Sequence, residues 1–176
     1  GLDLMRLTAY RLRRIRQLYK YQAGYMLEGE VEQVCADLYA RTDCVTGGWL
    51  THAKRLVQAV QRASKDRGAP VCVLVSAGQI VPTLAKLILF QLHEIFPSEN
   101  VYSSRRDGKL KCFETIAQRF GPGSRFVAIG DGREERQAAR TLSWPFIPIE
   151  LDLKNEDSVF NLTPKKVVQK LEASSG

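Results

Sequence analysis

The chain has 176 residues, of which 44% are hydrophobic and 26% charged, and this is the composition of a globular domain with a sizeable core. No apolar run reaches the roughly 18 residues of a membrane-spanning helix, and no basic-then-apolar secretory leader opens the sequence. The net charge of +7 permits attraction to phosphate-bearing partners without saying which ones. Because the sequence opens inside a basic amphipathic stretch, we expect it to be a piece of a longer protein.

The cysteines and histidines argue against a cysteine- or histidine-based metal site. The four cysteines show no CxxC or similar ligand spacing, and the two histidines, His52 and His93, are far apart in the sequence. We therefore expect a reduced, intracellular protein. The cysteines are Cys35, Cys44, Cys72 and Cys112.

The first third of the chain reads as helical. Apolar side chains recur at helical spacing in residues 4–22, 30–42 and 49–60, and Gly24 is a plausible end for the first helix. In the second helix, one face carries Val31, Val34, Cys35 and Leu38. Asp66, Arg67 and Gly68 mark a polar boundary, so we expect one domain over residues 1–68 and another over 69–176.

From Pro70 onward, strands alternate with helices. Strands are predicted at residues 70–76, 125–130 and 145–151, with a short extended run at 100–103, and the first two strands are expected to be buried on both faces. Helices are predicted after residue 79, at 109–120, at 134–142 and after the Thr163–Pro164 cap, with a solvated loop at 154–158. This alternation predicts an α/β fold with a parallel sheet.

Asp131 is the most suggestive polar residue, because it follows a predicted strand and stands between Gly130 and Gly132. The glycines permit a tight turn and close approach of a ligand, and a carboxylate at a strand end is a ligand that Mg²⁺ accepts. The alternative is a plain strand–turn–helix connection whose acids, Glu134 and Glu135, complement the helix dipole.

Two further strand-to-helix connections carry polar residues. Ser76 ends the first strand, where a hydroxyl beside backbone N–H groups can hold a phosphate oxygen, or can simply cap the next helix. Lys109 opens a helix, where an ammonium group can neutralise a phosphate, or can be an ordinary solvated lysine. The exposed-looking Arg105 and Arg106 are only a weak indication of anion steering.

Taken together, hydroxyl, lysine and aspartate occur in the order of the second, third and fourth motifs of haloacid dehalogenase-like phosphatases. The segments LVSAGQIVPTLAKLILFQL, ENVYSS, GKLKCFETIAQRFG and AIGDGREERQAA resemble the Eyes Absent family. The tail, TLSWPFIPIELD and LTPKKVV, is most similar to its plant branch, and MRLTAYRLRRIRQLY and WLTHAKRL resemble its helical insertion.

The resemblance implies a haloacid dehalogenase-like parallel sheet with residues 1–68 as a helical, cap-like insertion. It also implies a Mg²⁺-dependent aspartyl phosphatase acting on phosphotyrosine proteins or small phosphoesters, with a second role as a transcriptional coactivator. By position, Asp131 matches the metal-binding aspartate, Glu135 an accessory acid, Lys109 the lysine that pairs with phosphate and nucleophile, and Ser76 the second-motif hydroxyl. Animal members carry a run of threonines where this chain has Ser-Ala-Gly, which leaves the substrate preference open.

The family's first motif, Asp-x-Asp-x-Thr, does not occur in these 176 residues. Its first aspartate attacks phosphorus and its second serves as acid and then base. We expect the motif and its central strand to lie upstream in a longer protein, so that this chain alone is inactive and unstable.

Three functions therefore remain open. The first is phosphatase activity, with a location in nucleus and cytoplasm. The second is a non-catalytic binding module with a transcription-factor partner, or a nucleic-acid binder that uses the basic helix over residues 11–20. The third is a family member that has lost catalysis. We do not expect direct nucleic-acid binding, because Leu12, Ile15 and Leu18 indicate a half-buried helix with a solvated basic face, and we expect no membrane association.

Overall fold

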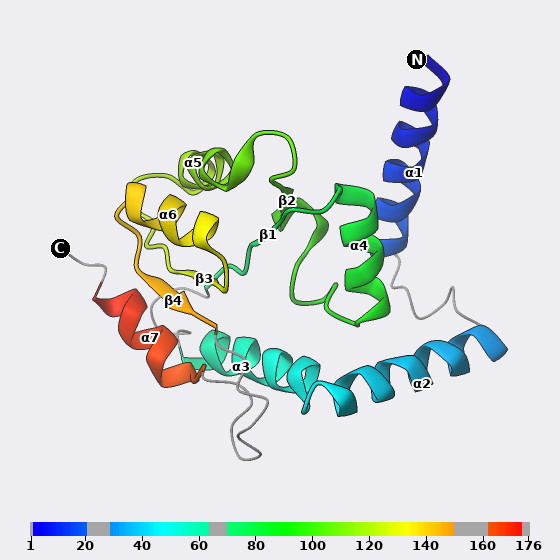
Figure 1. Ribbon diagram of the computed structural model, residues 1–176, viewed down its shortest axis with the longest axis horizontal. Helices are drawn as coiled ribbons and strands as arrows, with labels where there is room; N and C mark the ends of the chain where they lie inside the picture. The colour runs from blue at the N-terminus through cyan, green and yellow to red at the C-terminus, as the bar shows by residue number, and fades with distance from the viewer. Residues whose placement is uncertain (1, 21–28, 64–69, 150–161, 174–176) are drawn as a thin grey trace. The chain divides into compact units, whose positions relative to one another are not determined.

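A computed structural model of the chain describes residues 2–20, 29–63, 70–149 and 162–173. The chain forms two compact units, one of Gly1–Thr46 with Cys72–Arg105 and the other of Gly47–Val71 with Arg106–Gly176. Each unit contains one pair of short parallel strands and several helices (Figure 1). The predicted α/β class with parallel strands is confirmed. In the described part of the chain the strands form two separate two-stranded sheets and no closed sheet.

The first unit is built around the parallel strands β1 and β2. Leu74 pairs with Val101 and Ser76 with Ser103, so the two strands end together. The elements of this unit are α1 (Leu2–Lys20), α2 (Glu30–Val45), β1 (Leu74–Ser76), α4 (Ile80–Leu89), the 3-10 turn η3 (Ser98–Asn100) and β2 (Val101–Ser103).

The core of the first unit lies between α4 and β2, with the second half of α1 packed against it. Leu84, Leu87 and Val101 are buried, and Leu12 and Ile15 of α1 contact this cluster. Arg13, Arg14 and Arg16 of the same helix are exposed. The predicted helix with an apolar seam and a solvated basic face is therefore confirmed.

The apolar face of helix α2 is largely open. Val31 and Val34 are each 56% exposed and Leu38 is 57% exposed. No residue of α2 is buried. The helical period was predicted correctly, but an apolar stripe only shows that a helix has something to bury, and among the described residues nothing covers this one.

The second unit is built around β3 and β4, which are also parallel. Ala128 pairs with Phe146 and Gly130 with Pro148. Its elements are α3 (Trp49–Ala63), α5 (Gly108–Phe120), β3 (Ala128–Gly130), α6 (Arg133–Thr141), β4 (Phe146–Pro148) and α7 (Pro164–Glu172). Helix α6 packs against α5 and both strands, while α3 packs against α7.

The three strands predicted at 70–76, 125–130 and 145–151 are correctly placed, but each is only three residues long where described. The expectation of burial on both faces is wrong for β1, whose three residues are all partly exposed, and for β3. Ile129 and Ile147 are register partners in a parallel pair, yet Ile129 is 40% exposed and Ile147 is fully buried. Ile147 is covered by Leu56 of α3 and Val167 of α7. These helices cover β4, but on the same face of β3 the side chain of Ile129 stays exposed to solvent.

Other predictions have mixed outcomes. Thr163 caps α7 as expected, since its side-chain oxygen accepts the N–H of Lys166 at 3.3 Å and Pro164 opens the helix. The predicted helix end at Gly24 and the loop at 154–158 lie outside the described residues. The predicted boundary at residue 68 stays a prediction. None of the described helices is both long and apolar enough to cross a membrane.

Candidate active site

The turn between β3 and α6 carries the predicted metal-site aspartate. Asp131 is exposed and stands between Gly130, the last residue of β3, and Gly132, the N-cap of α6. Gly132 has no side chain with which to cap the helix, so the free N–H groups of the first turn need another acceptor.

Glu135 supplies that acceptor from three residues further along. Its Oε1 accepts the backbone N–H of Gly132 at 2.7 Å, which is one half of a capping box. The residue is only 6% exposed. The carboxylate therefore lies folded back under the turn that carries Asp131.

The two glycines around Asp131 are needed because of this carboxylate. A Cβ on Gly130 would lie 2.7 Å from Cγ of Glu135, and a Cβ on Gly132 would lie 2.7 Å from its Oε2. Neither glycine has a positive φ, so the constraint is steric. The sequence suggested that these glycines admit a ligand, whereas the structure shows that they admit the side chain of Glu135.

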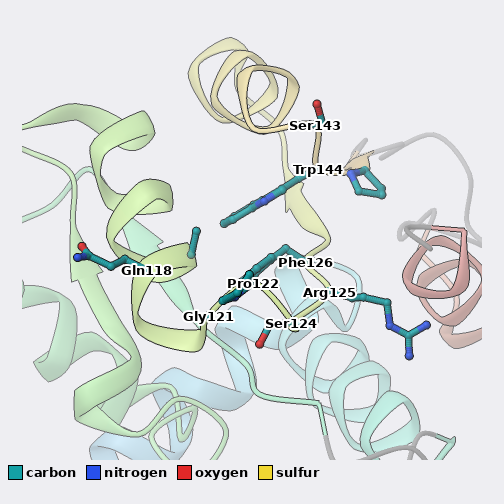
Figure 2. A pocket seen from close by; sticks show the side chains of 10 residues that line it. Gln118, Gly121, Pro122, Ser124, Arg125, Phe126, Ser143 and Trp144 are labelled. Carbon is teal, nitrogen blue, oxygen red and sulfur yellow. The ribbon is translucent and has the colours of Figure 1, made fainter. Parts of the chain in front are cut away.

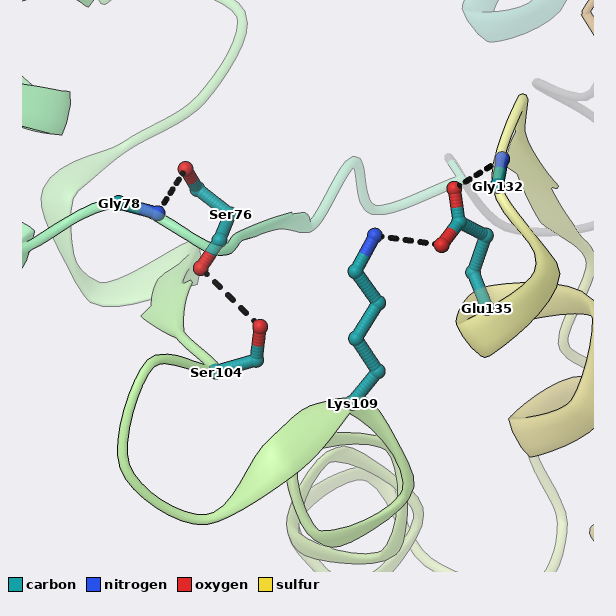
Figure 3. A network of polar contacts seen from close by, with 6 residues as sticks. All are labelled: Ser76, Gly78, Ser104, Lys109, Gly132 and Glu135. Atoms are coloured by element: carbon teal, nitrogen blue, oxygen red, sulfur yellow. Dashed lines mark hydrogen bonds and ion pairs between the residues drawn. The ribbon is translucent and has the colours of Figure 1, made fainter.

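Lys109 anchors the same carboxylate from the neighbouring helix. Its Nζ donates to Oε2 of Glu135 at 2.6 Å, and the side chains of Lys109 and Glu135 are 18% and 8% exposed (Figure 3). The alternative of an ordinary solvated lysine is therefore wrong. The ion pair joins the start of α5 to the start of α6, which are 26 residues apart in sequence.

The pKa of Glu135 reports the balance of these contacts. Burial raises the pKa. Four contributions outweigh burial and lower the pKa to about 2: the hydrogen bonds from Lys109, from the N–H of Gly132 and from the backbone N–H of Glu135 itself, and the positive charge of Lys109. Burial disfavours the charged form, and donors around a carboxylate favour it. Glu135 is therefore an anion at every physiological pH.

Ser76 lies in the first unit, at the end of β1. Its Oγ accepts the N–H of Gly78 at 3.0 Å and lies 3.4 Å from the hydroxyl of Thr83. Its carbonyl oxygen accepts the hydroxyl of Ser104 at 3.3 Å (Figure 3). The N-cap of α4 is Gln79 without a side-chain cap, so the alternative of a plain helix cap is wrong for Ser76.

Three of the four predicted site residues, Lys109, Asp131 and Glu135, are thus in the second unit, where Lys109 and Glu135 are in direct contact. Ser76 belongs to the first unit and is supported there by Gly78 and Thr83. Sequence reasoning missed Thr83 and Ser104, and it missed the steric role of the glycines. One signal was present for the glycines, since an acid three residues after an N-cap is the signature of a capping box.

The described residues do not by themselves make a Mg²⁺ site. Magnesium needs oxygen ligands in near-octahedral geometry, usually from one or two carboxylates together with water and phosphate. Both oxygens of Glu135 already accept hydrogen bonds, which leaves Asp131 as the carboxylate at this turn. In the described ranges, no group of three or more His, Cys, Asp or Glu residues is arranged to hold a metal.

Comparison with known proteins settles the family. No protein-family model matches the chain. Protein phosphatase EYA of Arabidopsis thaliana is 36% identical over 176 residues, which is 92% of this chain and 56% of the relative. Protein phosphatase EYA3 of Gallus gallus is 36% identical over 119 residues, which is 66% of this chain and 97% of the relative. The chain belongs to the Eyes Absent family.

The chain matches only a limited part of some longer Eyes Absent proteins. Protein phosphatase EYA2 of Homo sapiens is 38% identical over 149 residues, which is 83% of this chain but 27% of the human protein. The chain spans about a quarter of the length of such animal relatives, and just over half of the Arabidopsis protein. The resemblance to the Eyes Absent family inferred from the sequence motifs is confirmed, and the matching relatives include a plant protein. The roles of individual site residues stay predictions.

Proposed function

We propose that this chain is the part of a Mg²⁺-dependent, aspartyl-type protein tyrosine phosphatase that carries motifs two to four. Its relatives are named protein phosphatases, which supports a phosphorylated substrate. The substrate would be a phosphotyrosine protein or a small phosphoester. The expected location in nucleus and cytoplasm, and a transcription-factor partner, belong to the same proposal.

The buried ion pair between Lys109 and Glu135 is the observation that carries this function. Phosphoryl transfer is catalysed mainly by positioning and by neutralising negative charge. Glu135 holds the Lys109 ammonium at a fixed position, because Nζ of Lys109 lies 2.6 Å from Oε2 of Glu135. Glu135 itself lies next to the turn that carries Asp131. In this role Lys109 neutralises phosphate charge, Ser76 donates its hydroxyl to a phosphate oxygen, and Glu135 orients the lysine.

The proposed fold is a haloacid dehalogenase-like sheet completed by one further strand. Within the described residues, β1 is hydrogen-bonded only to β2, and β3 only to β4, so each pair has an open edge. Open edges are ready to accept another strand. We propose that the strand ending in Asp-x-Asp-x-Thr pairs with such an open edge.

For the metal, we propose that Asp131 contributes one carboxylate ligand and that the remaining ligands come from outside the sequence given. Mg²⁺ would supply positive charge for a phosphate oxygen. In this proposal, Mg²⁺ binds without breaking the ion pair between Lys109 and Glu135.

The isolated chain should be inactive, because it contains no Asp-x-Asp pair to act as nucleophile and acid. The absent motif also favours a second candidate function, a non-catalytic protein-interaction or coactivator module. The two candidates differ in whether a supplied first motif restores turnover.

The test is to assay the chain with Mg²⁺ on p-nitrophenyl phosphate and a phosphotyrosine peptide, alone and co-expressed with a segment that carries Asp-x-Asp-x-Thr. We expect turnover only in the second case, lost on Asp131→Asn and lowered at least about a hundredfold by Lys109→Met. Lys111→Met is the matched control, because Lys111 is an exposed lysine two positions further along α5. Turnover by the chain alone that Asp131→Asn abolishes would contradict the proposal. No turnover with a folded, complemented chain would favour the interaction module.

A further inference from the structure

Two adjoining hollows lie in the second unit, at the C-terminal end of α6. Their volumes are about 560 Å³ and 500 Å³, and Ser143, Trp144 and Pro145 line both. Figure 2 shows the first hollow, whose lining includes the stacked rings of Trp144 and Phe126 together with Pro122. We refer to the two together as the Trp144 surface.

Trp144 is a fixed wall of this surface. Its ring stacks on Phe126 at 4.3 Å between centroids and on Phe113 at 5.0 Å, with interplanar angles of 11° and 16°. Pro122 and Pro145 add two further rigid apolar groups. Rigid aromatic and proline side chains suit a binding surface because little side-chain entropy is lost when a ligand binds.

The charge on the Trp144 surface has one sign. Arg125 lines the first hollow, and Arg136, Arg140 and Lys170 line the second. Among the described residues that line the two hollows, there is no Asp or Glu. All four cations are exposed. The guanidinium of Arg136 lies 5.3 Å from the ring centre of Phe146, which fixes that charge beside the hollow.

This surface is separate from the candidate active site. Asp131 and Glu135 lie at the start of α6, whereas Arg140 and Ser143 lie at its end. Arg136 follows Glu135 in the sequence but lies on another side of the helix, because Arg136 is exposed and Glu135 is buried. A helix rises 1.5 Å per residue, so the two ends of this nine-residue helix are roughly 13 Å apart.

We propose that the Trp144 surface binds an acidic segment of a partner protein in which proline or aliphatic residues alternate with Asp or Glu. The acids match the exposed guanidinium groups of Arg136 and Arg140, and the apolar side chains match hollows whose lining includes Trp144, Phe126 and the two prolines. Single-stranded nucleic acid is the competing ligand for a basic aromatic surface, but it binds by stacking bases on available rings. Trp144 is already stacked on two phenyl rings of its own chain.

The test is fluorescence anisotropy with a labelled ten-residue peptide that alternates Asp-Glu pairs with Pro and Leu, compared with the same peptide carrying Asn and Gln. The variant is Arg136→Gln with Arg140→Gln, made in the full chain. The control is Arg41→Gln with Lys86→Gln, which removes the same charge from exposed positions of the first unit. Circular dichroism and the unfolding midpoint establish that both variants fold.

We expect the acidic peptide to bind more tightly than the neutral one, with affinity falling as salt rises, and the Arg136/Arg140 variant to bind about tenfold more weakly than the control. Equal binding by the two variants, or by the two peptides, would overturn the proposal. A labelled oligothymidine that binds more tightly than the peptide and loses affinity in the same variant would overturn it in favour of nucleic acid.

Discussion

The two strand-to-helix turns, β1 to α4 and β3 to α6, follow one plan with different chemistry. Each begins at the end of a three-residue parallel strand, passes through glycine and enters a helix whose N-cap residue makes no side-chain cap. In the first unit, the neutral hydroxyl of Ser76 accepts the glycine N–H. In the second, the ionised carboxylate of Glu135 does so.

The difference lies in what the acceptor requires around it. A hydroxyl needs no counter-charge and does not titrate, so the hydrogen bonds that Ser76 makes are insensitive to pH. A buried carboxylate needs a counter-charge, which is costly to remove once the group is buried. The Lys109–Glu135 pair consequently ties α5 to α6 and makes the second turn both rigid and acid-sensitive.

The largest expected effect comes from removing the counter-charge. Lys109→Met leaves the Glu135 carboxylate buried without its cation and should lower the free energy of unfolding by about 3–5 kcal/mol, measured by urea denaturation. Lys111→Met, in an exposed pair with Glu114, should cost less than about 1 kcal/mol. The double variant Lys109→Met with Glu135→Met should recover part of the loss. Equal losses for Lys109→Met and Lys111→Met would remove the contrast between the two turns.

Acid provides the next test of the same contrast. Because the pKa of Glu135 falls from 4.5 to about 2 on folding, its contribution is fully present above pH 4.5 and is lost as the pH falls toward about 2. That contribution is on the order of 3 kcal/mol. The stability difference between the wild-type chain and Glu135→Gln should shrink over this window, whereas Ser76→Ala should show no such change. A difference that stays constant down to pH 2 would mean that Lys109 does not hold the carboxylate ionised.

Alanine at the glycines compares the two turns directly. Gly130→Ala and Gly132→Ala should each cost about 1–3 kcal/mol, because the new methyl group meets the tethered Glu135 at 2.7 Å. Gly78→Ala should cost less, since its nearest contacts are Thr83 Oγ1 at 3.1 Å and Ser76 Oγ at 3.2 Å. Gly123→Ala is the control, with nothing within 4 Å of the added atom.

Thermal unfolding of these four variants ranks the costs. Combining Gly132→Ala with Glu135→Ala should give less than the sum of the two single losses, because the clash needs both groups. Additive losses, or a Gly78→Ala cost as large as that of Gly130→Ala, would show that the turns are constrained alike.

Local sequence patterns predicted the elements well because they depend on local physics. The helical period gave α1, α3 and α5, and Thr163–Pro164 gave the start of α7 within one residue. Burial was predicted less well, because it depends on what covers a face. Val34 and Ile129 look like core residues, and nothing in their own segments says that their faces are open.

The candidate site shows the same division. Ser76, Lys109, Asp131 and Glu135 were identified by their positions after strands and at helix starts, together with the family resemblance. Their contacts did not follow from spacing, since residues 109 and 135 are brought together by the packing of α5 on α6. The sequence therefore supplied candidate residues, whose roles stay predictions, and the structure supplied the ion pair between two of them.

The smallest effect concerns the other ends of the same two helices, where the units are alike. Gln91 after α4 and Ser143 after α6 have φ angles of 53° and 56°, and the next residue donates its N–H five positions back, Leu92 to Leu87 and Trp144 to Ala139. Glycine is favoured at this left-handed position because it has no Cβ to clash. Gln91→Gly and Ser143→Gly should each raise the free energy of unfolding by about 0.5–1 kcal/mol in urea denaturation. Similar gains would confine the difference between the units to the helix starts, where the glycine N–H is accepted by a neutral hydroxyl in one unit and by an ionised carboxylate in the other. A loss at either position would mean that the side chain of Gln91 or Ser143 stabilises the turn by more than the strain costs.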